Sequence, residues 1–599
     1  MLDLLVRYAH DHGLTARPGF KPKRVRWALV FDRRGRFLNA QELGDVGEKR
    51  NAGRQFPCCP DLSQPEMKAG GVGCRHFLVD TAEVVALHTK GEVNAKLRAK
   101  HAYFTDLLKS ASTVVPELAA IADELGDPTT LERIQTELRA LKAKSTDNVT
   151  MALMDEGLGF VADSEAWHQW WDDFRQRLSQ KRAQKRRAEA STTNRMRCLA
   201  SGALVEPALT HPKIEGLADV GGLSMGDALA SFKQDAFRSY GLEQSANAAV
   251  SEEMAAAYRA ALSHLIREHG RRLVGAKVVH WYSSEVSQAQ DPIVEIEQGD
   301  AGDDDWEDQP ITEREADADA QHRARKLLAS FATGEAGDLL NYRYYILILS
   351  GAAGRVMIRD WFEGQFGALR DTCNAWFDDL AIVHRNGDGL ARRPKFMAVL
   401  GALVRDLGEL HAPLVAKMWR VAVRGEAVPR EAMTQSLARS KVDVIQANPP
   451  NHARMGLLKA YHVRKGDDFM QPYLNEDHPH PAYHCGRAMA VLAEVQRAAL
   501  GEVGAGVVER YFAAASSTPA LVLGRLVRTS QFHLAGIREP VLRQWFDNRL
   551  AGVLAQIKDR VPATLTLEEQ SLFALGYYQQ KAARLKRESD DSTVQAPNT

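Results

Sequence analysis

The stretch from Leu339 to Glu363 reads LLNYRYYILILSGAAGRVMIRDWFE. Apolar and aromatic residues alternate over 342–349, and a period of two with such residues predicts a strand that is buried on at least one face. Small residues at 350–354 supply a turn, and 355–361 form the returning strand. The sequence therefore predicts a β-hairpin at the point where mixed strand and loop patterns give way to helical ones.

The returning strand places Arg355, Arg359 and Trp361 on one face. Some proteins hold the bases and phosphates of single-stranded nucleic acid on a basic and aromatic sheet face of this kind. An amphipathic strand that covers a hydrophobic core has the same pattern, and we favour that structural interpretation. Arg355 and Arg359 stay candidates for nucleic-acid contact.

The composition is that of a globular protein with several domains. The chain has 599 residues, of which 45% are apolar and 26% charged, and its formal net charge is zero. A chain of this length divides into about three or four domains, and six cysteines are too few for a disulfide scaffold. The N-terminus lacks a signal peptide and no run of about 18 apolar residues occurs, so we expect a cytoplasmic protein without a membrane span.

Basic residues gather around a second predicted hairpin near the N-terminus. Apolar residues alternate over 25–31, and a turn at 32–35 leads back into 36–38. A solvated hairpin rim and an edge that contacts phosphates explain this charge about equally well, because few acidic residues intervene. The candidates for phosphate contact are Lys21, Lys23, Arg24 and Arg26.

A loop rich in proline and glycine covers 54–76 and reads RQFPCCPDLSQPEMKAGGVGCRH. Three glycines allow its backbone to approach another surface closely, and two basic residues flank them. These residues are Gly70, Gly71, Gly73, Lys68 and Arg75. The pattern predicts a loop that contacts nucleic acid.

The same loop contains a potential zinc set of Cys58, Cys59, Cys74 and His76. Adjacent cysteines followed by a Cys-x-His pair match no common zinc spacing, so unliganded thiols are the better interpretation. We expect no metal and no other cofactor.

Two further stretches bear on catalysis. Residues 222–226 read GLSMG, which fits the nucleophile elbow of some hydrolases, but no apolar strand leads into them and no suitable helix follows. The acidic stretch at 291–319, with the core GDAGDDDWEDQP, is typical of an exposed linker, because consecutive carboxylates repel one another. Both contexts favour a protein without catalytic activity.

Beyond the hairpin, apolar stripes at helical spacing and short connections are typical of an antiparallel helical bundle. We therefore predict an α+β protein in which mixed α/β N-terminal and central domains with β-hairpins precede an all-α C-terminal bundle. The predicted divisions are an N-terminal α/β domain at 1–190, a central α/β segment at 191–298, an acidic linker at 299–320, a hairpin and helical domain at 321–476, a four-helix bundle at 482–588 and a disordered tail at 589–599.

Several long phrases of the sequence point to one family. They are THPKIEG at 210–216, SFKQDAFRSYGLEQSANAAVSEE at 231–253, RYYILILS and RVMIRDW in the hairpin, AYHCGRAMAVLAEVQRAALG at 482–501 and RYFAAASSTPA at 510–520. Together and in this order they resemble the large subunit of the type I-C CRISPR surveillance complex, Cascade. The sequence departs from the family pattern at Lys233 and at Gly351-Ala352.

The resemblance implies a non-enzymatic subunit at the 5′-handle end of the guide that reads the protospacer-adjacent motif, helps to open the duplex and stabilises the R-loop in antiviral defence. In this family a small subunit corresponds to the C-terminal bundle, whose basic residues would extend a track along the displaced strand. These residues are Arg487, Arg525, Arg528 and Arg543. The implied partners are guide crRNA, target double-stranded DNA and its displaced strand, the handle-processing subunit, backbone subunits, small subunits, and a helicase-nuclease recruited after target binding.

Two other functions stay open. A metal-dependent nuclease would need carboxylates, such as those of Asp303 to Asp308, fixed around a divalent ion. A purely structural scaffold would make no DNA contact of its own.

Overall fold

The predicted hairpin is present, and its strands are longer than the alternation indicated. β14 (Arg343–Ala352) and β15 (Arg355–Gln365) are neighbours in one sheet. The two residues between them, Ala353 and Gly354, have φ of 49° and 85°. Positive φ at both central residues is what a type I′ turn requires, and that turn matches the twist of the strands it joins.

The computed structural model describes residues 1–599 except 15–16, 45–52, 156, 188–194, 233, 239, 241, 243, 301–338, 502, 504–505, 559 and 595–599. Most of the predicted acidic linker, 299–320, therefore lies outside the described residues. The chain forms two units. Unit 1 comprises Met1–His269 and Ser350–Met357, and unit 2 comprises Gly270–Leu349 and Ile358–Thr599.

Unit 1 contains a sheet with the strand order β3-β2-β6-β5, in which β7 also pairs with β6. β2 pairs antiparallel with β3, as the second predicted hairpin requires, and parallel with β6. Every residue of β2 is buried. The strands of unit 1 are β1 (Phe20–Val25), β2 (Trp27–Phe31), β3 (Phe37–Glu42), β4 (Arg54–Pro60), β5 (Asp80–Thr81), β6 (Asn148–Met154), β7 (Leu158–Phe160), β8 (Met196–Arg197), β9 (Leu204–Val205), β10 (Lys213–Ile214) and β11 (Asp227–Ala228).

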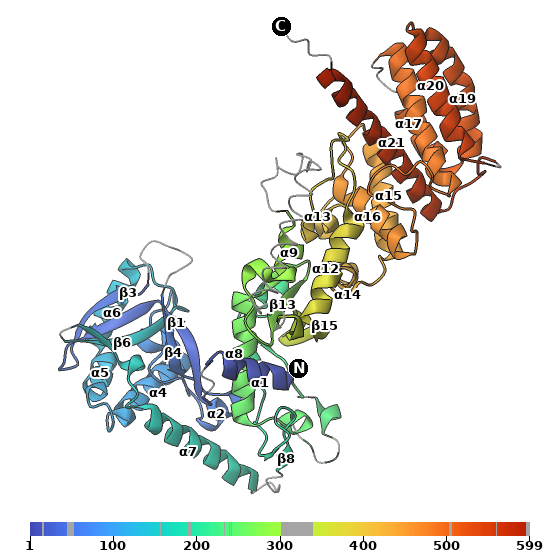
Figure 1. Ribbon diagram of the computed structural model, residues 1–599. Helices are drawn as coiled ribbons and strands as arrows, with labels where there is room; N and C mark the ends of the chain where they lie inside the picture. The colour runs from blue at the N-terminus through green and yellow to red at the C-terminus, as the bar shows by residue number, and fades with distance from the viewer. Residues whose placement is uncertain are drawn as a thin grey trace. The chain divides into compact units, whose positions relative to one another are not determined.

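Among the helices of unit 1, α6 packs against β3 and α3 against β6, whereas α1 packs on α8 (Figure 1). The helices of unit 1 are α1 (Leu2–Asp11), α2 (Gln64–Ala69), α3 (Ala82–Ala86), α4 (Ala95–Ala111), α5 (Glu117–Gly126), α6 (Pro128–Ala140), α7 (His168–Arg187) and α8 (Glu252–Glu268). One hydrophobic core links β2, β6 and helices α3 to α6.

Unit 2 begins with two strands that continue into the hairpin. β12 (Arg271–Leu273) pairs with β13 (Ala276–Tyr282), and β13 pairs with β14, both antiparallel. The helices are α9 (Pro292–Gln298), α12 (Phe366–Leu380), α13 (Phe396–Gly401), α14 (Ala412–Arg424), α15 (Arg430–Ile445), α16 (His452–Arg464), α17 (Pro481–Leu500), α18 (Val507–Ser517), α19 (Pro519–Gly536), α20 (Pro540–Ala555) and α21 (Leu567–Val594). Strands in the N-terminal and central regions and a helical C-terminal region confirm the predicted α+β class.

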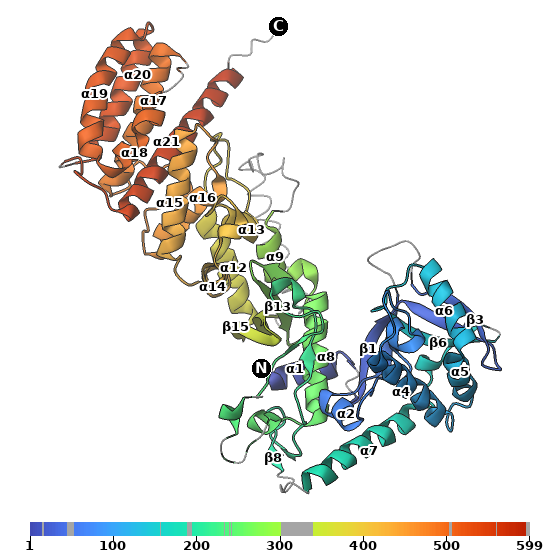
Figure 2. The same ribbon diagram turned by 180° about the vertical axis from the view of Figure 1, so that it is seen from behind.

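The last helices form the predicted bundle, in which α17 contacts α18, α19, α20 and α21 (Figures 1 and 2). α21 also contacts α15 and α16, and one hydrophobic core runs from β12 to α21. Among the described residues, no gap in that core separates the predicted divisions 321–476 and 482–588, and His478, which lies between them, is itself buried. The finer domain division stays a prediction.

Local signals set most helix boundaries. α6 begins at Pro128 because the Asp127 carboxylate caps it. Pro519 starts a new helix directly after α18, so α19 follows α18 with a single residue between them. α13 is short, and mostly irregular chain follows it before α14.

α17 and α21 cross with their backbones in direct contact. A Cβ atom added at Gly486 would lie 1.9 Å from the carbonyl oxygen of Phe573, and one added at Gly576 would lie 2.0 Å from that of Tyr483. Real Cβ atoms do not approach a carbonyl oxygen so closely, and backbone cannot move aside as a flexible side chain can. Glycine at both positions therefore sets the distance between the two helices.

We predict that Gly486→Ala and Gly576→Ala each destabilise unit 2 by roughly 3 kcal/mol, because the added methyl group forces the helices apart. Gly552→Ala is the matched control, since Gly552 lies within α20 with nothing inside 4 Å of its Cβ position. That control should gain about 0.5–1 kcal/mol from helix propensity. Scanning calorimetry of the three variants and the parent measures the effect, and equal midpoints for Gly486→Ala and Gly552→Ala would contradict the assignment.

Candidate nucleic-acid interface

The three glycines of the N-terminal loop follow the short helix α2. The Glu66 carboxylate accepts hydrogen bonds from the Ser63 N–H (2.7 Å) and hydroxyl (2.6 Å), which closes the first turn as in a capping box. The buried Glu66 also forms an ion pair with Arg175 at 2.8 Å. A local cap and one long-range ion pair thus fix the start of the helix that leads into the loop.

The backbone of residues 70–73, which we call the glycine loop, packs directly on α4. A Cβ atom at Gly73 would lie 2.6 Å from the carbonyl oxygen of Ala99, and φ at Gly73 is +91°. A Cβ atom at Gly70 would lie 2.3 Å from the sulfur of Cys74. Glycine is required at these two positions by close approach and, at Gly73, also by conformation.

The outer side of the glycine loop is open. Gly71 has φ of +85° with nothing within 4 Å of its Cβ position, and Val72 is 89% exposed. Lys68 is exposed on α2, and the half-buried Arg75 donates a hydrogen bond to the carbonyl oxygen of Cys74 at 3.3 Å. A narrow backbone ridge with basic side chains beside it is therefore presented to the surface.

The sequence analysis did not identify Lys96 as part of this surface. Lys96 is exposed and lies one helical turn before the Ala99–Lys100 segment that Gly73 contacts, so it is on the same face of α4. The helical period alone indicates which residues share that face. It does not indicate that the glycine loop packs there, because this contact joins distant parts of the chain.

A partly buried carboxylate, Asp61, lies shortly before α2 in the sequence. It forms ion pairs with Arg259 (3.4 Å) and Lys21 (3.5 Å), and its carboxylate is 3.8 Å from the His76 ring. Burial would raise the pKa of Asp61, but the positive charges of Lys21, Lys23 and Arg259 outweigh burial and lower it. Asp61 therefore stays ionised at neutral pH. It pairs with Lys21, which the sequence analysis predicted as a phosphate contact.

His76 is the neutral member of this cluster. Burial, followed by the charge of Lys23, lowers its pKa to about 3 despite the nearby Asp61. Its Nδ1 accepts a hydrogen bond from the Leu62 N–H at 3.1 Å. An uncharged imidazole at neutral pH is needed for that bond.

Of the predicted N-terminal contacts, Lys23 has a structural role. Its ammonium group donates to the carbonyl oxygens of Pro60 (3.0 Å) and Val79 (3.3 Å), and burial lowers its pKa. Lys21 pairs with Asp61, and Arg26 forms an ion pair with Glu42 at 2.7 Å. Arg24 is exposed on β1. We therefore remove Lys23 from the proposed phosphate contacts, because its ammonium group already bonds inside the protein.

Arg487 also has an internal role. It is 3% exposed and donates to the Gln580 side-chain oxygen (3.1 Å) and the Glu476 carbonyl oxygen (3.1 Å). Burial lowers its pKa despite an ion pair with the Glu476 carboxylate at 3.3 Å. Helical spacing alone did not show that the side of α17 carrying Arg487 faces α21. We no longer count it among the basic residues available to nucleic acid.

The remaining candidates are exposed. Arg355 and Arg359 are exposed on β15, whereas Trp361 is half-buried and stacks on Tyr345 with ring centroids 6.0 Å apart. One face of the Trp361 ring is therefore covered by the protein's own aromatic side chains. The other predicted arginines of the bundle, Arg525, Arg528 and Arg543 on α19 and α20, are also exposed.

The potential metal and hydrolase sites do not assemble. Cys74 donates to the Tyr103 hydroxyl at 3.3 Å, and Cys59 is buried. Across the described residues, no three His, Cys, Asp or Glu side chains lie close enough to hold a metal ion. Residues 222–226 form a turn before β11, without the strand and helix of a nucleophile elbow.

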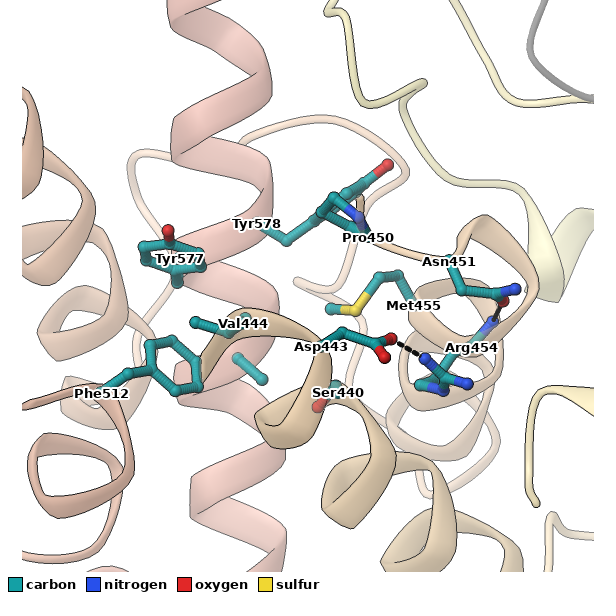
Figure 3. Close-up of a pocket in the computed structure, with 11 residues that line it drawn as sticks. Ser440, Asp443, Val444, Pro450, Asn451, Arg454, Met455, Phe512, Tyr577 and Tyr578 are labelled. Carbon is teal, nitrogen blue, oxygen red and sulfur yellow. Dashed lines mark hydrogen bonds and ion pairs between the residues drawn. The ribbon is translucent and has the colours of Figure 1, made fainter. Parts of the chain in front are cut away.

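A small cavity in unit 2 lies among α15, α16, α18 and α21 (Figure 3). It has a volume of about 20 Å³ and an apolar lining that includes Phe512, Tyr577 and Met455. The buried ion pair of Arg454 with Asp443 lies at its side (Figure 3). The space holds a single water molecule at most, so we assign no ligand to it.

Residues 5–585 of the chain match the sequence model of one protein family, which is described as "CRISPR-associated protein (Cas_Csd1)". The chain belongs to the Cas_Csd1 family of CRISPR-associated proteins. A comparison with curated proteins found no match. Membership agrees with the resemblance at the coarser level of a CRISPR-associated, Cascade-type subunit that acts with other Cas proteins. In the part of the Cas_Csd1 chain that the structure describes, every helix is too short or too polar to span a membrane.

We predict that unit 1 of this Cas_Csd1 protein loses stability as the pH falls below about 6.5, the unfolded-state pKa of histidine. The pKa of His76 is about 3 in the folded state, so between these values the unfolded chain binds more protons than the folded one. At pH 5 this difference is worth roughly 2 kcal/mol. Asparagine keeps a hydrogen-bond acceptor for the Leu62 N–H and does not titrate.

His76→Asn should therefore show a smaller fall in its thermal midpoint between about pH 7.5 and pH 5 than the parent does. Scanning fluorimetry at the two pH values measures this difference. Because other buried histidines titrate in both proteins, the comparison isolates His76. Identical falls in the two proteins would show that His76 makes no such contribution.

Proposed function

We propose that this chain is the non-catalytic large subunit of an RNA-guided type I-C CRISPR interference complex. In this proposal it recognises the protospacer-adjacent motif, helps to open the duplex and stabilises the R-loop in antiviral defence in the cytoplasm. The observation that carries the proposal is the glycine loop of a Cas_Csd1 protein, a rigid and nearly side-chain-free ridge with basic residues beside it.

The shape of the glycine loop suits a groove of double-stranded DNA. The minor groove is about 6 Å wide, and backbone without large side chains enters it most readily. Contacts between Gly73 and α4 fix the backbone before binding, so little conformational entropy is lost when DNA is bound. Lys68, Arg75 and Lys96 would then contact the phosphates on either side.

A short motif is all that such a subunit needs to read. In RNA-guided complexes the guide supplies most of the sequence recognition by base pairing, and the protein reads the adjacent motif and the backbone. The partners in this proposal are guide crRNA, target DNA, the handle-processing subunit, backbone subunits, small subunits and a recruited helicase-nuclease. The exposed Arg525, Arg528 and Arg543 support contact with the displaced strand.

We predict that Lys68→Ala, Arg75→Ala and Lys96→Ala each weaken binding of the assembled complex to a motif-bearing duplex by about fivefold, or roughly 1 kcal/mol. Binding to an unrelated duplex should change less, because the loop engages fully only at the motif. Arg24→Ala should weaken both duplexes alike by removing a phosphate contact. Electrophoretic mobility shifts with the two duplexes measure these affinities.

Arg139→Ala is the control, since Arg139 is exposed on α6 and forms no ion pair with any described residue. It should bind both duplexes like the parent. If all of the loop variants also bind both duplexes like the parent, the glycine loop does not read the motif. Equal loss on both duplexes would instead assign the loop to general phosphate contact.

We also predict that the purified full-length chain leaves labelled DNA and RNA intact in the presence of magnesium, manganese or zinc. The GLSMG context and the linker character of the acidic stretch at 291–319 motivate this expectation. Gel analysis of both nucleic acids after incubation tests it. Cleavage that needs a divalent ion and disappears on substitution of one acidic residue would favour the alternative, a metal-dependent nuclease.

A further inference from the structure

An open pocket in unit 2 lies where α14 turns into α15. The sequence from Lys417 to Arg430 reads KMWRVAVRGEAVPR. α14 ends at Arg424, Gly425 follows with φ of +69°, and Pro429 precedes the first residue of α15. A glycine in the left-handed conformation thus ends α14, and a proline precedes α15.

The pocket has a volume of about 450 Å³. Five of its lining residues are charged, namely Lys417, Arg420, Glu426, Arg430 and Glu431. Lys417, Arg420 and Arg424 follow one another at helical spacings of three and four, so they share one face of α14. That basic face extends about 10 Å along the helix axis.

The turn that forms one wall of the pocket is rigid. The guanidinium of Arg464 donates hydrogen bonds to the carbonyl oxygens of Val421 (2.7 Å) and Glu426 (2.6 Å). It also donates a hydrogen bond to the Asp379 carboxylate at 2.6 Å. These bonds link the end of α14, the turn and α16. A pocket wall fixed in this way requires little ordering when a ligand binds.

Positive charge is available in this pocket. Arg420 is paired with Asp360 (3.0 Å) and Glu426 (3.5 Å), which orients its guanidinium and shares its single positive charge between two carboxylates. Lys417 and Arg430 are exposed and form no ion pair with any described residue. Glu431 is the carboxylate of the lining that opposes them. Of the five charged lining residues three are basic and two are acidic, so the lining itself has a net charge of +1. Glu568 also interacts electrostatically with Arg430.

We propose that this pocket binds a phosphate of the backbone of single-stranded nucleic acid, with Lys417 and Arg430 as the direct contacts and Arg420 as their oriented neighbour. A phosphodiester fits because it is small and anionic and accepts hydrogen bonds from several N–H donors. The basic face of α14 would contact the next phosphates along the strand. The inference rests on the proposed function, since it assigns a further contact to a nucleic-acid-binding subunit.

The test uses the full-length chain with fluorescein-labelled single strands of about 20 nucleotides, in a DNA arm and an RNA arm, over about 50 to 300 mM salt. In at least one arm, the double variant Lys417→Ala/Arg430→Ala should bind about tenfold more weakly near 100 mM salt. Its negative slope of log affinity against log salt should become shallower by about 1.4, because each cation lost removes about 0.7 for a single strand. A purely structural role would not change that slope.

Two further variants sharpen the test. Glu431→Gln removes the opposing charge and should tighten binding about twofold in the same arm. Arg405→Ala, at an exposed arginine elsewhere in unit 2 without an ion pair among the described residues, should behave like the parent. An effect confined to one arm identifies the strand, and effects in both arms assign the pocket to phosphate without regard to sugar.

The possible failures are distinct. A parent chain that binds single strands while the double variant keeps its affinity and slope would overturn the pocket assignment and leave the proposed function standing. A parent chain that binds neither strand would also overturn the pocket assignment, whereas the proposed function is tested separately by the duplex binding of the assembled complex. Competition by a polyglutamate peptide as strong as that by unlabelled nucleic acid would also overturn the assignment, because it would show general anion binding.

Discussion

The contact between α17 and α21 at Gly486 and Gly576 is the constraint on which unit 2 depends. Carbonyl oxygens of the opposite helix occupy the space that a Cβ atom would need. This separation buries almost the whole N-terminal part of α17, and with it Arg487. An arginine on this crossing must find partners inside the protein, and it finds them in α21 and in the chain before α17. Close packing of backbone thus decides which charges reach the surface.

Unit 1 shows the same relation between packing and charge. Asp61 is ionised and only partly exposed, and basic side chains compensate its charge. A buried carboxylate without such partners would be costly, so these side chains are committed to the fold. Lys68, Arg75 and Lys96 stay near the surface of the glycine loop. The proposed interface is therefore smaller than the run of basic residues in the sequence, and it includes Lys96 on α4.

The glycine loop and the α14–α15 pocket both present rigid groups to a ligand, but they do so in different ways. The loop gives up side chains so that backbone can approach a partner, and its contact with α4 provides the rigidity that glycine lacks. The pocket keeps long basic side chains at its mouth, and Arg464 makes its wall rigid. In both places hydrogen bonds or close packing within the protein hold the groups that would contact a ligand.

Local sequence determined the hairpin, the helix-rich C-terminal half and most helix ends, because alternation, capping residues and Pro519 act over a few neighbouring positions. The family was also evident from long phrases of sequence. Only the tertiary structure decided which basic residues are available, since the burial of Lys23 and Arg487 depends on segments far away in the chain. It likewise decided that the glycine loop packs on α4 and that α14 and α15 enclose a basic pocket. The physical reason is that burial and proximity are properties of the packed chain, which no local pattern of residues contains.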